Sequence, residues 1–234
     1  MEKGVIVGCD RELEWALPWW WKHYSAHNHY PVAFFDFGMS AKAAAWCKKR
    51  GDLLSVPFPE ISLKTEKEKD WVPFYGENIP ISRIAWFKKP FAALHSPFPL
   101  TIWLDLDCQV QSSLNPLFSY LHLGAEIALL KYPNTQWMRD GEKHYNSGVL
   151  VFLQGTKIIQ QWAALSLELA TEFPGDEEVL SRAISLYKPL LIELPPTYNW
   201  FYDLPPNPNS VIQHFTGPGG KVKILLSMRE FGVL

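Results

Sequence analysis

Two aspartates, Asp105 and Asp107, follow a short apolar segment at residues 100–104 and have the spacing needed to bind a cation. The segment is rich in strand-forming residues and predicts a strand buried on both faces in a parallel sheet. Because side chains alternate along a strand, the two carboxylates project to one side and can converge. We expect them at the carboxyl end of the strand, where open α/β sheets bind ligands. The pair predicts a divalent metal bridging a diphosphate; the alternative is a turn cap or a pairing with a basic side chain.

A second segment whose residue types could bind a ligand covers residues 211–221. In it, His214 lies on a predicted strand, which is followed by a glycine-rich turn with Gly217 and then by Lys221. Backbone N–H groups in such a turn make an anion nest, which a lysine completes as a point charge. An imidazole together with two carboxylates suits Mn²⁺ better than Mg²⁺, which remains the alternative ion. The structural alternative for His214 is a histidine satisfied within the core.

Two further groups of polar residues lie at predicted element boundaries. Asn146 and Ser147 precede Gly148 and a strand, so that they can hydrogen-bond a ligand where the glycine lets backbone come close. The alternative is an ordinary turn. Asp176 and Glu177 open a predicted helix, where Asp176 would be the N-cap and Glu177 would favour the positive helix terminus. That structural role accounts for both carboxylates without catalysis.

The elements that must position these residues alternate along the chain. Residues 1–55 predict strands at 5–7, 31–37 and 53–56, with a helix begun near Pro18 and another over 41–50, capped by Ser40. This β-α-β-α-β order indicates a parallel sheet with right-handed crossovers.

A helix over 82–95, interrupted at Pro90, carries Arg83, Lys88 and Lys89; the lysines could equally form a solvated face. The charged run 64–70 predicts a solvated loop or helix end. Strands at 125–130 and 190–194 and helices over 156–173 and 176–187 complete an α/β fold with a mostly parallel mixed sheet flanked by helices.

The composition excludes several classes of protein. With 234 residues, 47% of them apolar, the chain can bury one substantial core. A formal charge of −2 provides no basic footprint for nucleic acid. Three cysteines with no CxxC pair favour a reducing compartment, so we expect a cytoplasmic protein. The first apolar run is too short for a signal peptide, and no uncharged apolar span is long enough for a transmembrane segment. We therefore expect a soluble protein, or at most one peripheral to a membrane.

Taken together in chain order, these segments resemble the retaining glycosyltransferases of the GT-A fold, and in particular family 8, which includes glycogenin and bacterial lipooligosaccharide galactosyltransferases. The resemblance covers nearly the whole chain. It rests on Gly8-Cys9-Asp10, Arg83 with Lys89-Pro-Phe-Ala, Leu104-Asp-Leu-Asp107, Tyr145-Asn-Ser-Gly-Val149, Asp176-Glu-Glu-Val-Leu180, Leu194-Pro-Pro-Thr-Tyr-Asn199, and His214-Phe-x-Gly217 with Lys221.

The resemblance implies a role for each matching residue. It implies that Asp105, Asp107 and His214 ligate Mn²⁺ on the donor diphosphate and that Lys221 holds the leaving diphosphate. Asp176 and Glu177 would lie beside the anomeric carbon of the donor sugar. The remaining positions would contact the sugar nucleotide: Gly8, Cys9 and Asp10 at the nucleoside, Arg83 and Lys89 at the phosphates or sugar hydroxyls, and Asn146 at the donor sugar. Leu106, Ser147 and Gly217 would belong to the same sugar-nucleotide site.

The resemblance therefore implies a single glycosyltransferase domain over residues 1–234, with a nucleotide-sugar-binding half at about 1–118 and an acceptor-binding half at about 119–234. It implies metal-dependent transfer of a hexose from a UDP-linked sugar, with retention, to a carbohydrate, lipid-linked or protein acceptor. The chain departs from the family at Glu177, where glutamine is common, and at Lys221, which lies one residue further from His214 than usual. The alternatives are a non-catalytic sugar-nucleotide-binding module and a metal-dependent nucleotidyltransferase.

Overall fold

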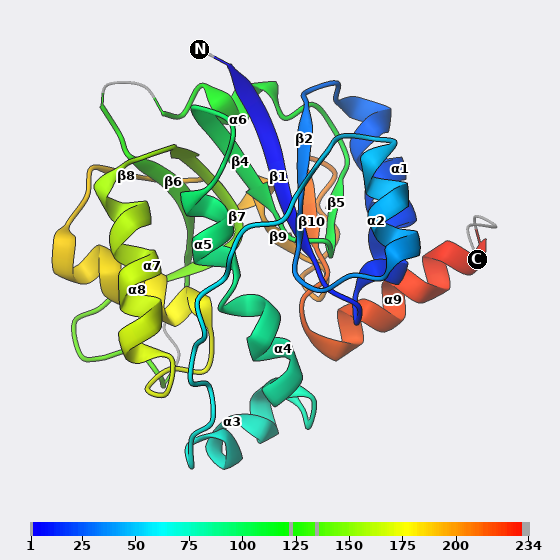
Figure 1. The fold of residues 1–234 in the computed structure, drawn as a ribbon. Helices are drawn as coiled ribbons and strands as arrows, with labels where there is room; N and C mark the ends of the chain where they lie inside the picture. Colours follow the sequence, from blue (N-terminus) through cyan, green and yellow to red (C-terminus); the bar gives the residue numbers. More distant parts are fainter. Residues whose placement is uncertain (1, 122–123, 134–135, 231–234) are drawn as a thin grey trace.

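The central element of the fold is a seven-stranded sheet in the order β3-β2-β1-β4-β7-β6-β8 (Figure 1). The computed structural model describes residues 2–121, 124–133 and 136–230. Only β7 runs antiparallel to its neighbours, so the mostly parallel α/β sheet predicted from the sequence is confirmed. The strands are β1 Lys3–Cys9, β2 Val32–Asp36, β3 Asp52–Leu54, β4 Leu100–Leu104, β6 Ile127–Tyr132, β7 His144–Leu153 and β8 Leu191–Glu193.

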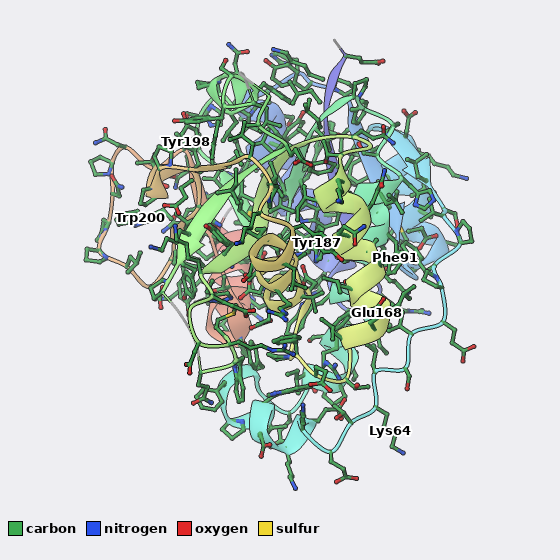
Figure 2. The ribbon with its side chains drawn as sticks, turned by 90° about the vertical axis from the view of Figure 1, so that its left-hand side faces the viewer. Lys64, Phe91, Glu168, Tyr187, Tyr198 and Trp200 are labelled. Carbon is green, nitrogen blue, oxygen red and sulfur yellow. The ribbon has the colours of Figure 1, made fainter. Side chains whose placement is uncertain are left out.

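Helices cover both faces of this sheet (Figure 1). On one face lie α1, Leu17–His27, and α2, Ala41–Lys48; on the other lie α5, Lys89–Leu94, α7, Lys157–Leu169, and α8, Asp176–Tyr187. Figure 2 shows the second group, in which α5 and α7 carry the labelled Phe91 and Glu168. Because strand side chains alternate, neighbouring residues enter different cores. Ile102 packs with the α1 face and Trp103 with the α7 face, and both are buried.

A second, three-stranded sheet adjoins the carboxyl end of β4. It consists of β5, Cys108–Val110, β10, Ile212–His214, and β9, Trp200–Phe201, with β10 in the middle. Residues 105–107 form the turn between β4 and β5, where the amide of Cys108 donates to the carbonyl of Asp105 at 3.0 Å. The two aspartates thus lie in a turn between the two sheets, beyond the end of β4.

The remaining elements connect or flank these sheets. They are α3 Glu68–Tyr75, α4 Ile79–Trp86, α6 Asn115–Phe118, α9 Gly217–Glu230 and the short 3₁₀ turns Glu14–Ala16 and Pro196–Tyr198. Ser40 caps α2 as predicted, because its Oγ accepts from the amide of Ala43 at 3.2 Å. In the described part of the chain, no helix has the length and apolarity that crossing a membrane requires.

Two local predictions are wrong. The N-cap of α8 is Gly175, and Asp176 is the first helical residue, so its carboxylate is available for other contacts. The glycine-rich segment beginning at Gly217 forms the first turn of α9 instead of a free turn. Thr156 occupies the N-cap position of α7, and its hydroxyl donates to the carbonyl of Leu153.

Candidate active site

A cavity of about 550 Å³ opens where β4 and β10 end and where β7 and α8 begin. The antiparallel direction of β7 matters here, because its amino end meets the carboxyl end of β4. Ten of the residues singled out in the sequence line this cavity: Lys89, Asp105, Asp107, Asn146, Ser147, Asp176, Glu177, His214, Gly217 and Lys221. The fold therefore gathers polar groups from five separate segments at one place.

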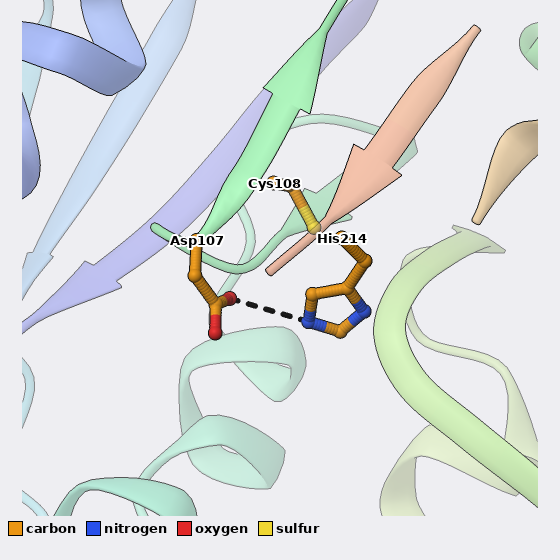
Figure 3. Close-up of side chains that lie close together, drawn as sticks. All are labelled: Asp107, Cys108 and His214. Atoms are coloured by element: carbon orange, nitrogen blue, oxygen red, sulfur yellow. Dashed lines mark ion pairs between the residues drawn. The ribbon is translucent and has the colours of Figure 1, made fainter. Parts of the chain in front are cut away.

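The two aspartates converge on one face of His214. The Nε2 atom of His214 lies 3.2 Å from Oδ1 of Asp107 and 3.9 Å from Oδ2 of Asp105. Figure 3 shows the first of these contacts, with the ring approaching from β10 and the carboxylate from the turn after β4. His214 is 2% exposed and the side chain of Asp105 is 26% exposed, so the cluster can be reached from the cavity through Asp105. Two carboxylates and an imidazole nitrogen are a ligand set suited to Mn²⁺.

The tautomer of His214 is fixed by a chain of amide side chains. The amide of Asn146 donates to Glu177 at 2.8 Å, so its Oδ1 accepts from Nδ2 of Asn199 at 2.8 Å. The Oδ1 of Asn199 then faces Nδ1 of His214 at 2.8 Å and must accept its proton. Nε2 faces the two carboxylates, and with a cation between them its lone pair would serve as a ligand. The residues present therefore fit a divalent metal, with Asn199 as the outer group that orients its histidine ligand.

Cys108 belongs to the same cluster, because its Sγ lies within 4.8 Å of the ligand atoms of Asp107 and His214. Burial, followed by the charges of Asp107 and Asp105, raises the pKa of this thiol well above its usual range. The protonated sulfur donates to the carbonyl of Gly148 at 3.7 Å. Since a metal takes the thiolate and not the thiol, we assign Cys108 to the packing beneath the site.

The site requires glycine at position 148, because a side chain there would collide with the ring of His214. A Cβ at this position would lie 2.1 Å from Cε1 of His214, and that ring is held on its other side by stacking on Phe201, with centroids 5.5 Å apart. We expect Gly148→Ala to displace the imidazole and to weaken Mn²⁺ binding roughly tenfold or more, measured by calorimetry. The control is Val149→Ala, which removes core volume on the opposite face. Equal Mn²⁺ affinity in the glycine variant and wild type would contradict this account.

Two lysines neutralise the carboxylates of the cavity. Lys89, from the start of α5, is 5% exposed and lies 3.0 Å from Oδ1 of Asp105 and 3.4 Å from Oδ2 of Asp176. Although burial acts to lower the pKa of Lys89, the two aspartates raise it above its usual range. Lys221, from the first turns of α9, pairs with Asp107. Burial acts to raise the pKa of Asp107, but Lys221 and His214 hold it well below its usual range.

Asp176 and Glu177 are neighbours in sequence with different surroundings. Asp176 is 4% exposed, accepts from the hydroxyl of Ser147 at 2.8 Å and pairs with Lys89. Burial raises the pKa of Asp176 to about 6. The side chain of Glu177 is 24% exposed and reaches the cavity between Asn146 and His144, whose Nε2 lies 3.2 Å from its Oε1. Of the two, Glu177 has more access to a ligand in the cavity.

The expected role of Arg83 at the donor is wrong. Arg83 is 0% exposed and does not line the cavity; its guanidinium crosses the interior between α4 and the end of α7. It donates to the carbonyls of Leu63, Ala170, Phe173 and Pro174 and to the carboxylate of Glu68. It also stacks against Trp71, 4.6 Å from the ring centre. The sequence placed Arg83 and Lys89 on one predicted helix, but they lie on the separate helices α4 and α5, and only Lys89 reaches the cavity.

The predicted nucleoside residues are divided between surface and core. Gly8, Asp10 and Leu106 line a second cavity of about 70 Å³ that shares Asp105, Asp107, Lys89 and Lys221 with the larger one. Asp10 accepts from the amide of Leu13 at 2.9 Å, and burial raises its pKa. The side chain of Cys9, in contrast, is buried in the core cluster on the α1 face and lines neither cavity, so its expected side-chain role is wrong.

The sequence analysis missed several lining and supporting residues. Phe74, Tyr75, Trp86 and Trp137 form one wall of the larger cavity, and the rings of Phe74 and Trp137 meet edge to face at 5.6 Å. Asn199 and His144 do not line the cavity but contact residues that do. Asn199 hydrogen-bonds His214, and His144 pairs with Glu177. Asn199 lies within a segment that the sequence marked as part of the resemblance, whereas no sequence signal distinguished His144.

No protein-family model matches the chain, and no curated protein matches it by sequence. Solved structures do match by shape. The galactosyltransferase LgtC, solved with donor and acceptor sugar analogs, has a TM-score of 0.66 at 15% identity, over 96% of this chain and 95% of that one. Mouse xyloside xylosyltransferase 1 has a TM-score of 0.58 at 14% identity, over 92% and 97%. The glycosyltransferase GlyE of Streptococcus pneumoniae has a TM-score of 0.58 at 18% identity, over 92% of this chain and 55% of that one. The chain thus has the GT-A type of fold that these glycosyltransferases share.

Proposed function

We propose that this protein is a metal-dependent glycosyltransferase of the family 8 type, which transfers a hexose from a UDP-linked sugar to an acceptor with retention. The observation that carries the proposal is the convergence of Asp105, Asp107 and His214 in the lining of a 550 Å³ cavity. The same three positions were singled out from the sequence. The shared fold with glycosyltransferases supports the same conclusion.

In this proposal Asp105, Asp107 and His214 would hold Mn²⁺, which when bound supplies positive charge to the donor diphosphate. Lys221 and the amino end of α9 provide further positive charge on the same side of the cavity. Departure of a sugar from a diphosphate needs this neutralisation, because charge develops on the leaving oxygen. The nucleoside would extend toward Gly8, Asp10 and Leu106 in the smaller cavity.

The donor sugar would lie between Asn146, Ser147 and the pair Asp176 and Glu177, which also line the cavity. Either carboxylate could stabilise positive charge at the anomeric carbon or attack it. The aromatic wall formed by Phe74, Tyr75, Trp86 and Trp137 remains for the acceptor. Aromatic faces with polar edges suit the apolar face of a sugar ring, so we propose a carbohydrate group on the acceptor.

The test is release of UDP from a panel of UDP-sugars, with and without Mn²⁺ and in the absence of acceptor. We expect slow Mn²⁺-dependent hydrolysis of one donor, which would also identify the sugar. Binding of UDP in the presence of Mn²⁺ without turnover, with or without sugar acceptors, would favour a binding module. Pyrophosphate release from a nucleoside triphosphate and a sugar phosphate would favour a nucleotidyltransferase.

A further inference from the structure

His144 is a buried histidine whose Nδ1 hydrogen-bonds a backbone carbonyl and whose Nε2 lies within ion-pair distance of a carboxylate. It begins β7 and is 0% exposed. Its Nδ1 lies 3.2 Å from the carbonyl oxygen of Pro133, and its Nε2 lies 3.2 Å from Oε1 of Glu177. A neutral imidazole carries one N–H and one lone pair, so it could satisfy only one of these oxygens. Turning the ring over would place carbon atoms against both.

The position of Glu177 is fixed from its other side. Its Oε2 accepts from Nδ2 of Asn146 at 2.8 Å, and the orientation of that amide is settled because its Oδ1 accepts from the amide of Gly148 at 2.9 Å. One carboxylate oxygen therefore faces a donor amide and the other faces His144. Both oxygens are held, while the side chain remains 24% exposed at the cavity.

We propose that His144 is a positioning residue that, as an imidazolium, holds Glu177 as an oriented carboxylate on the cavity wall. The ionised carboxylate of the Asp176 and Glu177 pair that faces the donor sugar is then Glu177. Asp176 is engaged instead with Ser147 and Lys89. The role toward a sugar rests on the proposed function, whereas the charge state of the His144 and Glu177 pair does not.

The charged groups around the pair support this assignment. Although burial acts to lower the pKa of His144, Glu177 and then Glu178 raise it. Burial acts to raise the pKa of Glu177, but His144, Lys89 and His214 lower it. Glu178 accepts from the hydroxyl of Tyr75 at 3.0 Å, and burial, followed by the charge of Glu177, raises its pKa to about 8.

Glu178 accepts from Tyr75, which leaves Glu177 as the carboxylate that pairs with His144. The ring of Tyr132, from β6, packs edge to face on His144 with centroids 5.4 Å apart. Its phenol is neutral at this pH, because burial raises its pKa. The groups that face the pair thus favour one imidazolium beside one carboxylate.

The test is nuclear magnetic resonance of the histidine rings in the full chain, with the His144 signals assigned through the backbone. We expect wild type to show a doubly protonated His144 at pH 7 and a titration midpoint above the ordinary value of about 6.5. In Glu177→Gln, the amide can turn its NH₂ toward Nε2, and we expect the midpoint to fall by about one pH unit or more. The matched control is Glu193→Gln, which should leave the midpoint unchanged.

A singly protonated His144 at pH 7 in wild type, or the same midpoint in wild type and Glu177→Gln, would overturn the proposal. Kinetics then test its consequence. We expect His144→Gln to lower kcat for UDP release at least tenfold with little change in KM, and to flatten the alkaline limb of the pH profile. A correct ring titration with no UDP release from any donor would leave the pair established and the proposed function wrong.

Discussion

Asp107→Asn is expected to abolish Mn²⁺-dependent binding of UDP while leaving the fold intact. Asparagine has nearly the shape of aspartate, but it lacks the charge that faces both His214 and Lys221. Loss of a charged ligand from a site of three should weaken metal-linked nucleotide binding on the order of a hundredfold or more. Calorimetric titration of UDP with and without Mn²⁺ measures the effect directly.

The matched control for this variant is Asp52→Asn at the exposed start of β3, which should bind as wild type. Circular dichroism and the unfolding midpoint without metal would show that the fold is retained. If Asp107→Asn kept the wild-type difference between UDP affinities with and without Mn²⁺, Asp107 would have no place in the metal site. Its role would then be limited to its ion pair with Lys221.

Arg83→Met is expected to lower the free energy of unfolding by about 3–5 kcal/mol, the range found when one partner of a buried charged network is removed. Methionine retains part of the apolar stem but leaves the carbonyls of Leu63, Ala170, Phe173 and Pro174 without their donor. It also leaves Glu68 without its cation. Urea unfolding monitored by tryptophan fluorescence gives the loss.

The same variant separates a structural role from a donor-binding one. Because Arg83 does not line the cavity, the folded fraction of Arg83→Met should bind UDP with wild-type affinity. Arg229→Met, at an exposed position of α9, should change stability by no more than about 0.5 kcal/mol. A stable Arg83→Met protein with weakened UDP binding would reverse our correction and return Arg83 to the donor site.

The sheet could be predicted from the sequence because its determinants are local. The apolar segment before Asp105 and the cap residue Ser40 each set their element through neighbours within a few positions. The convergence of Asp105, Asp107 and His214 was also accessible, since carboxyl ends of neighbouring strands meet at one edge. The turn that follows β4 was missed, because a run of apolar and acidic residues does not show where one sheet ends and another begins.

The contacts that could not be predicted join residues far apart in the chain. Arg83 lies on α4, which precedes β4 in the chain. The position of Arg83 along the sequence does not reveal which way its side chain turns. Its partners are carbonyls near residues 170–174, which have no signature in the sequence. The same holds for His144 and Glu177, whose contact depends on β7 and α8 packing together. The sequence also does not show that Asp176 faces Lys89, with Gly175 at the N-cap of α8.

The irregular pairing of β7 with β6 has a consequence for how the protein folds. Leu129 of β6 pairs with Leu150, but the next residue, Leu130, pairs with Asn146, so a short part of β7 leaves the ladder. Within that part the amide of Gly148 is bound by the side chain of Asn146, which also contacts Glu177 and Asn199. A cavity-lining side chain therefore satisfies a backbone amide of the strand that carries it. A chain in which β6 and β7 are not yet paired lacks this arrangement of the cavity. Ligand binding during refolding should therefore begin only once β6 and β7 have paired.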